Sequence, residues 1–286
     1  MSTWMPKGDT GLTINEIAEM LKTICVGNCT IALSGSHAKG LADEYSDIDI
    51  IVYFENPKPY ETQKLIVESF ADNHNAMVPS DHVSAHWGGL ISFDYKGTFV
   101  EVTTRFYENT MKYINDCIEG HIEVLPAEWS INGFYTFTYI SEISYVKPIW
   151  DPSSFIDNTQ KLINPYPKKL KKAILDTFGA RMRATLNSDH YKIMIKRRDM
   201  FVVQRCIQLI LLNMAQVINA LNETYFTGDK HTAKKLAKLP YCPSKLLDNL
   251  GFLMSSYDNV LQMERQRNLL LEIADELNAK CDGLTC

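Results

Sequence analysis

Residues 35–54 read GSHAKGLADEYSDIDIIVYF, a glycine-flanked polar turn that runs into an apolar segment headed by two carboxylates. Asp47 and Asp49 are separated by one residue in a stretch rich in β-branched and aromatic side chains, which is typical of a strand. The two-residue period of a strand places both carboxylates on one face. Neighbouring anions repel each other unless a cation lies between them, and hard oxygen ligands suit Mg²⁺. The segment therefore predicts a divalent metal site.

The residues just upstream predict a phosphate-binding turn. Residues 30–33 have the pattern of a short buried strand, and Ser34, Gly35 and Ser36 follow as a turn. Glycine lets backbone N–H groups approach a ligand closely. Each half of this pattern is common by itself, because Gly-Ser pairs occur in many loops and an Asp-x-Asp pair can lie on a solvated strand edge. Together they favour a site that holds phosphate oxygens beside a metal ion.

The joint pattern G-S-x-A-x-G, a short spacer and then S-D-I-D before apolar residues resembles the signature of the DNA polymerase β-type nucleotidyltransferase superfamily. In that superfamily the serine of the turn helps to hold a nucleoside triphosphate, and the two aspartates bind metal ions. The resemblance implies these roles for Ser36, Asp47 and Asp49. It further implies that Gly35 permits the close approach and that Lys39 contacts the triphosphate.

A third carboxylate is expected on a later strand. Residues 90–95 and 98–104 have strand character and are separated by a plausible hairpin turn. Glu101 alternates with Val100 and Val102, so its side chain faces away from theirs. An exposed strand glutamate is the ordinary interpretation, but the superfamily takes a third carboxylate from a later strand, and Glu101 is the best-placed acid. Metal ligand and general base both remain open as its role.

Composition limits the class of protein. A chain of 286 residues is long for one compact domain and sufficient for two. Its net charge of −5 and ordinary apolar content argue against a disordered chain or a polybasic binder. The seven cysteines show no disulfide or zinc framework, which favours a reducing compartment. With no signal-peptide pattern and an apolar segment at 206–221 that polar residues interrupt, we expect a cytoplasmic protein without a membrane span.

A change in composition predicts two domains, residues 1–160 and residues 161–286. Residues 164–167 read NPYP and suggest a linker, and beyond them only helical periodicity is present. The expected fold class is an α/β (α+β) nucleotidyltransferase domain with a mixed sheet, followed by an all-α helical bundle domain. We expect the substrate to bind between the two.

Periodicity also predicts individual helices. Residues 60–72 have the pattern of a helix with Leu65, Ile66 and Phe70 on its inward face. A single long helix is expected over about residues 191–221, where an apolar face follows an early charged cluster.

Residues 221–230, LNETYFTGDK, end this long helix with a glycine turn. Together with the early Arg-Asp pair, this ending resembles the C-terminal domain of bacterial nucleotidyltransferases related to the aminoglycoside and lincosamide enzymes. The resemblance implies ATP as the donor and an antibiotic hydroxyl as the acceptor. It also suggests Lys230 as a nucleotide contact, although a lysine that stabilises a helix end is the simpler explanation.

These features predict a Mg²⁺-dependent nucleotidyltransferase that moves a nucleoside monophosphate, AMP from ATP, to a hydroxyl of a small molecule. Two alternatives stay open: transfer to a protein or RNA, and a non-catalytic nucleotide-binding regulator. The basic run at residues 168–172 raises nucleic acid as a partner, but the acidic net charge and the lack of interleaved aromatic residues argue against it. A monomer and a homodimer are both compatible with the sequence.

Overall fold

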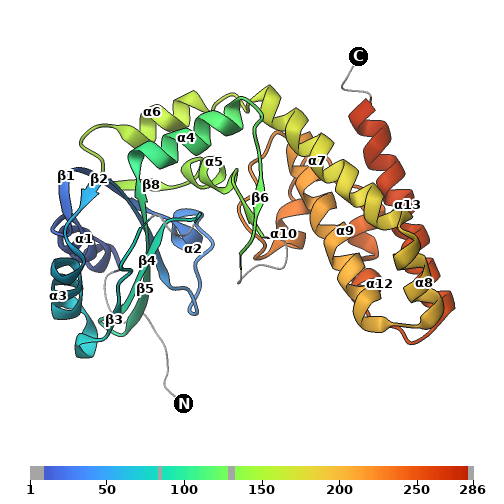
Figure 1. The fold of residues 1–286 in the computed structure, drawn as a ribbon, viewed down its shortest axis with the longest axis horizontal. Helices are drawn as coiled ribbons and strands as arrows, with labels where there is room; N and C mark the ends of the chain where they lie inside the picture. Colours follow the sequence, from blue (N-terminus) through green and yellow to red (C-terminus); the bar gives the residue numbers. More distant parts are fainter. Residues whose placement is uncertain (1–9, 83–85, 128–132, 283–286) are drawn as a thin grey trace. The chain divides into compact units, whose positions relative to one another are not determined.

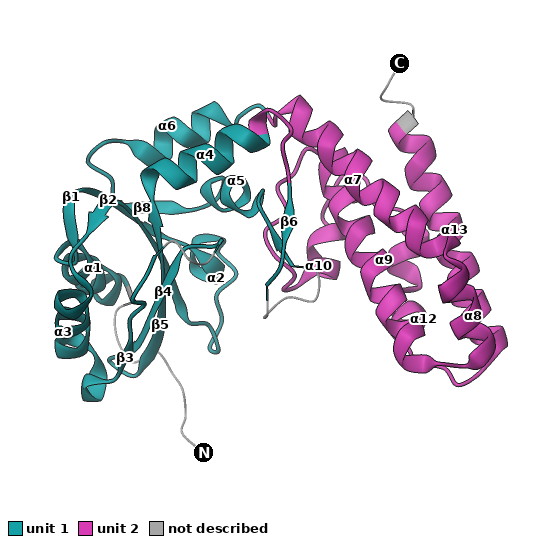
Figure 2. Cartoon of the chain, viewed as in Figure 1, with its two compact units in different colours: residues 1–117, 123–165 teal, residues 118–122, 166–286 magenta. Residues whose placement is uncertain are grey.

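The computed structural model describes residues 10–82, 86–127 and 133–282. The chain divides into two compact units, coloured separately in Figure 2. Unit 1 comprises Met1–Cys117 and Glu123–Pro165, and unit 2 comprises Ile118–Ile122 and Tyr166–Cys286. The predicted domain boundary between residues 160 and 161 stays a prediction.

Unit 1 is built on a six-stranded sheet with the order β3-β4-β5-β2-β1-β8. The strands β2 and β5 are parallel and the other neighbouring pairs are antiparallel, so the predicted mixed sheet is confirmed. The six strands are β1 (Cys25–Leu33), β2 (Ile48–Pro57), β3 (Ala76–Met77), β4 (Gly89–Tyr95), β5 (Thr98–Phe106) and β8 (Lys147–Trp150). A separate two-stranded sheet pairs β6 (Val124–Leu125) with β7 (Phe134–Tyr135).

Helices flank the large sheet of unit 1, with α1 and α3 on one side of it (Figure 1). The helices of this unit are α1 (Thr10–Lys22), α2 (Gly35–Ala38), α3 (Tyr60–Phe70), the 3₁₀ helix η1 (Asp72–His74), α4 (Tyr107–Ile118), α5 (Thr138–Ile143) and α6 (Phe155–Leu162). Residues Ile17 of α1, Ile50 and Val52 of β2, and Val67 of α3 belong to one buried apolar cluster. This cluster fills the space between the two helices and the sheet.

Strand β2 has two different faces at its start because one face meets this core and the other does not. Ile48 and Ile50 are buried in the core, whereas Asp49 between them is half-buried on the opposite face. Asp47 lies one residue before the strand begins and is also half-buried. The predicted alternation of carboxylates with apolar residues is therefore confirmed.

The predicted inward face of α3 is partly wrong. Ile66 and Phe70 pack against the core, but Leu65 is 68% exposed. Gln63 and Val67 are the buried residues of this helix. A spacing of four residues along an α-helix brings these two side chains to one face, and Leu65 falls on the other. The Gln63 amide is tolerated inside because its Nε2 donates to the carbonyl of Lys58 at 2.7 Å.

His82 also contacts the buried Gln63. Its Nε2 lies 3.1 Å from Gln63 Oε1 and its Nδ1 lies 2.6 Å from Thr104 Oγ1. Since an amide oxygen only accepts, Nε2 carries the proton and Nδ1 accepts from the threonine hydroxyl, as in a neutral imidazole. Burial lowers the pKa of His82 below its ordinary value of 6.5, and the nearby Asp81 opposes this shift.

This arrangement predicts an acid-sensitive contribution to stability. Below pH 6.5 the unfolded chain binds a proton at His82 more readily than the folded chain does, so the free energy of unfolding falls as the pH falls. We expect the loss of stability between pH 7.5 and pH 5.5 (about one pH unit on either side of the ordinary histidine pKa) to be smaller in His82→Gln than in the wild type. Urea unfolding at both pH values measures the free energy of unfolding of each protein. An equal loss in the two proteins would contradict the neutral, buried state of His82.

Unit 2 is entirely helical in its described residues, which confirms the predicted all-α domain (Figure 1). Its helices are α7 (Lys168–Asn187), α8 (Asp189–Arg197), α9 (Met200–Leu221), α10 (Thr232–Leu236), α11 (Ser244–Asp248), α12 (Leu250–Met254) and α13 (Val260–Asp282). Helix α9 is the central element, since it contacts α7, α8, α10, α12 and α13.

The single long helix expected over residues 191–221 is wrong, because the chain breaks between Arg197 and Met200. Arg198 adopts a left-handed conformation with φ of 58°, which ends α8. The Asp199 side chain then accepts the backbone N–H of Val202 at 3.1 Å and caps α9. The charged cluster thus marks a helix boundary, where the local capping bond overrides the helical periodicity.

Helix α9 has 22 residues, and an 18-residue segment of it has a mean hydropathy of 1.6. By length and composition alone, it is the one described helix that could cross a membrane. Within this segment, 50% of the residues are buried inside the protein. The core helix of a globular unit meets the same criteria, and α9 occupies that position in unit 2. The evidence for a membrane span is therefore weak, and the cytoplasmic location stays a prediction.

Candidate functional site

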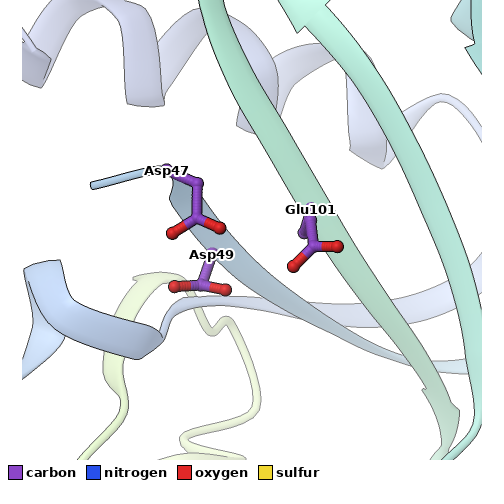
Figure 3. Close-up of side chains that lie close together, drawn as sticks. All are labelled: Asp47, Asp49 and Glu101. Atoms are coloured by element: carbon purple, nitrogen blue, oxygen red, sulfur yellow. The ribbon is translucent and has the colours of Figure 1, made fainter. Parts of the chain in front are cut away.

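Three carboxylates meet at the edge where β2 begins. Asp49 on β2 lies opposite Glu101 on the parallel strand β5, and Asp47 precedes β2 by one residue. One carboxylate oxygen from each side chain lies within 4.8 Å of the other two, and all three residues are half-buried (Figure 3). Among the described residues, no other group of three His, Cys, Asp or Glu side chains lies this close together.

The repulsion within this cluster indicates what it can bind. Two like charges about 4 Å apart repel each other by about 4 kcal/mol at an effective dielectric constant of 20. A bound cation removes this cost, and a set of carboxylate oxygens is the donor set that hard cations such as Mg²⁺ prefer. The residues present therefore fit a divalent cation, with Asp47, Asp49 and Glu101 as its candidate ligands.

Gly35 lies directly against the carboxylate of Asp49. The backbone N–H of Ser34 donates to the carbonyl of Asp49 at 2.8 Å, which brings the end of β1 beside the start of β2. Gly35 has a φ of +56°, and a Cβ atom added to it would lie 1.6 Å from Asp49 Oδ2. Glycine is therefore required here to leave room for a carboxylate of the cluster, a role that the sequence pattern did not predict.

The predicted turn at residues 34–36 is the start of the four-residue helix α2. Ser34 is the N-cap of α2, and its side chain makes no capping hydrogen bond. Ser36 Oγ is buried and has no hydrogen-bond partner among the described residues. A buried hydroxyl without a partner costs about 1–3 kcal/mol, so such a group usually marks the place of a ligand or water. Ser36 follows Gly35 directly and therefore lies close to the carboxylate cluster.

Lys39 stands at the end of α2 and contacts an aromatic ring. Its Nζ lies 4.2 Å from the ring centroid of Tyr145, whose hydroxyl lies 3.5 Å from Ser34 Oγ. Burial raises the pKa of Tyr145 above its ordinary value, and the negative charges of Glu142 and Asp49 add to this shift. Sequence reasoning included Ser34 in the predicted turn but missed Tyr145, because no local motif marks that residue.

An ion pair between a buried arginine and a half-buried glutamate lies further along the same face of β5. Arg105, two alternations beyond Glu101, pairs with Glu142, donates to the carbonyl of Trp87 at 3.0 Å and stacks on Tyr139. Burial opposes the charge of the Arg105 guanidinium, but Glu142 keeps its pKa above the ordinary value. Because protein groups already pair with the Arg105 guanidinium, we assign Arg105 a structural role on this face of β5 and no role in binding phosphate.

Lys230 lies in unit 2, in an exposed turn between α9 and α10. Its role as a nucleotide contact stays a prediction.

Comparison with known families adds the decisive observation. The family described as nucleotidyltransferase domain matches residues 14–84 of the chain. The match includes Gly35, Ser36, Lys39, Asp47 and Asp49, and it ends before Glu101. Unit 1 contains a nucleotidyltransferase domain. The predicted relationship to the DNA polymerase β-type nucleotidyltransferase superfamily is confirmed.

Beyond this domain the comparisons are less informative. A nucleotidyltransferase-like protein from Exiguobacterium sibiricum 255-15 is similar to 94% of this chain and 75% of its own, with a TM-score of 0.46 and 9% sequence identity. No curated protein matches the sequence. A likeness of this size supports no conclusion about activity.

Proposed function

We propose that this protein is a Mg²⁺-dependent nucleotidyltransferase that moves AMP from ATP to a hydroxyl group of a small molecule. The observation that carries the proposal is the cluster of Asp47, Asp49 and Glu101 within 4.8 Å, whose two aspartates lie in the segment that matches a nucleotidyltransferase domain. The buried and unpaired Ser36 Oγ supports it, because this hydroxyl can donate to a phosphate oxygen. Cation and triphosphate would then share one site.

Each side chain of the site has a separate role in the proposed transfer. Asp47 and Asp49 would hold Mg²⁺, which when bound offsets negative charge on the triphosphate and on the departing pyrophosphate. Ser36 would hydrogen-bond a phosphate oxygen and Lys39 would add a positive charge beside it. Glu101, from the neighbouring strand, would accept the proton of the acceptor hydroxyl. The hydroxyl oxygen forms a bond to the α-phosphorus while the bond from that phosphorus to pyrophosphate breaks.

The C-terminal half of the chain supplies the argument for the acceptor. The ending LNETYFTGDK at residues 221–230 resembles the C-terminal domain of enzymes that modify aminoglycosides and lincosamides. This resemblance supports a small hydroxylated antibiotic as the acceptor and ATP as the donor.

A transfer assay with labelled nucleotides tests the proposal. The protein is incubated with Mg²⁺, each α-labelled nucleoside triphosphate in turn and a panel of aminoglycosides and lincosamides. We expect pyrophosphate release with ATP and a mass increase of one AMP on an acceptor.

Ser36→Ala should lower kcat/KM about tenfold, because a lost hydrogen bond to a charged group costs roughly 1.5 kcal/mol. Ser69→Ala is the matched control, since Ser69 is exposed and its hydroxyl donates locally to the carbonyl of Ile66.

Two outcomes would contradict parts of the proposal. Label that appears on protein or RNA, and on no small molecule, would overturn the assigned acceptor class. Tight nucleotide binding without any transfer, unaffected by Asp49→Asn, would instead favour a non-catalytic nucleotide-binding regulator.

A further inference from the structure

Tyr145 reaches the site from a part of unit 1 that carries no nucleotidyltransferase motif. Strand β8 pairs with β1 in the antiparallel sense, and Lys147 lies opposite Leu33. Tyr145 precedes β8 by two residues and therefore lies beside Ser34, the residue that leads into α2. The hydroxyl groups of Tyr145 and Ser34 are 3.5 Å apart. The residues just before the edge strand β8 thus place an aromatic ring beside the segment that carries Gly35 and Ser36.

The ring of Tyr145 holds the ammonium group of Lys39. The distance from Lys39 Nζ to the ring centroid is 4.2 Å, well inside the range of a cation–π contact. The ring covers one side of the ammonium group. A lysine ammonium carries three N–H donors and can contact more than one partner at a time. Lys39 is half-buried, and this contact restricts where its charge can lie.

The phenol remains neutral in this position. Burial raises the pKa of Tyr145, and the carboxylates of Glu142 and Asp49 raise it further. A neutral ring adds no negative charge next to a polyphosphate, and its hydroxyl can still hydrogen-bond with Ser34.

We propose that Tyr145 is a positioning residue for the nucleotide, whose ring places the Lys39 ammonium where it contacts the triphosphate. A lysine that is already held in place loses less side-chain entropy when it binds a phosphate than a freely rotating lysine does. Tyr145 therefore strengthens triphosphate binding without contacting the nucleotide. This inference rests on the proposed function and adds a residue to its nucleotide site.

Calorimetric titration with α,β-methylene-ATP and Mg²⁺ tests the inference, with AMP as the second ligand. We expect Tyr145→Leu and Lys39→Met each to weaken binding of the triphosphate analogue by about three- to tenfold, the range of a partly desolvated cation–π contact. Tyr145→Phe keeps the ring and should bind like the wild type. The double variant should bind no more weakly than Lys39→Met alone, because both changes remove one interaction. Binding of AMP should change little in any variant.

Lys112→Met is the matched control, since Lys112 also lies over a tyrosine ring, at 5.3 Å from Tyr113, but stands exposed on α4. Tyr145→Gln serves as a second ring-free variant if Tyr145→Leu does not fold. Effects that multiply in the double variant, or a loss in Tyr145→Phe equal to that in Tyr145→Leu, would overturn the inference. The wild type could bind the analogue and Ser36→Ala could lower its affinity while the Tyr145 variants leave the affinity unchanged. In that case only the role of Tyr145 is overturned, and the proposed function stands. No binding by the wild type would overturn the proposed function as well.

Discussion

Replacing Asp49 by asparagine is expected to remove Mg²⁺-dependent nucleotide transfer almost completely. The substitution keeps the size of the side chain but removes one charge from a cluster in which one oxygen of each side chain lies within 4.8 Å of the other two. Loss of a metal ligand removes several kcal/mol of transition-state stabilisation, and about 4 kcal/mol corresponds to roughly a thousandfold in rate. Pyrophosphate release with ATP measures the rate, and titration with Mn²⁺ as a substitute cation measures the metal affinity.

Glu44→Gln is the matched control for this experiment. Glu44 is exposed in the loop before β2, and its replacement removes the same charge near the site without touching the cluster. We expect the control to keep nearly full activity, so that long-range charge and ligand loss can be separated. An Asp49→Asn protein with an undiminished rate would refute the metal site. Equal losses in both variants would show that the net charge of the region matters and not the ligand.

Gly35→Ala is expected to have the second largest effect, although glycine carries no functional group. The new Cβ would lie 1.6 Å from Asp49 Oδ2, so the backbone of α2 and the Asp49 side chain cannot both keep their positions. Misplacement of a reacting group by about 1 Å costs on the order of a hundredfold in rate. We therefore expect kcat/KM to fall by about that factor, and metal affinity to fall with it.

Gly40→Ala separates the clash from backbone strain. Gly40 also has a positive φ, +66°, but a Cβ atom added there meets nothing within 4 Å. Both substitutions should destabilise the fold by about 1–2 kcal/mol, the usual cost of a left-handed L-residue. Only Gly35→Ala should also lose metal binding. Thermal unfolding and Mn²⁺ titration of both proteins check this, and equal metal affinity in the two would show that the contact with Asp49 is unimportant.

The site and the fold were predictable to different extents. The pairing of Asp47 with Asp49 on one face follows from the two-residue period of a strand, and the alternation of Ile48 and Ile50 with Asp49 supports it. The helix break at Arg198 was not predictable from periodicity, because the apolar positions before and after the charged residues 196–199 fit one helical period. A single capping bond from Asp199 decides the boundary.

The sequence by itself determined the local features of this protein: the carboxylate pair at the head of a strand, the Gly-Ser segment before it, and the helical character of the second half. These depend on the steric periods of neighbouring residues, which act over a few positions. The tertiary structure alone decided that Glu101 lies opposite Asp49, that Gly35 makes room for Asp49, and that Tyr145 holds Lys39. Each of these contacts joins segments that are separate in the chain, and the register of the sheet that brings them together is set by burial of the whole core.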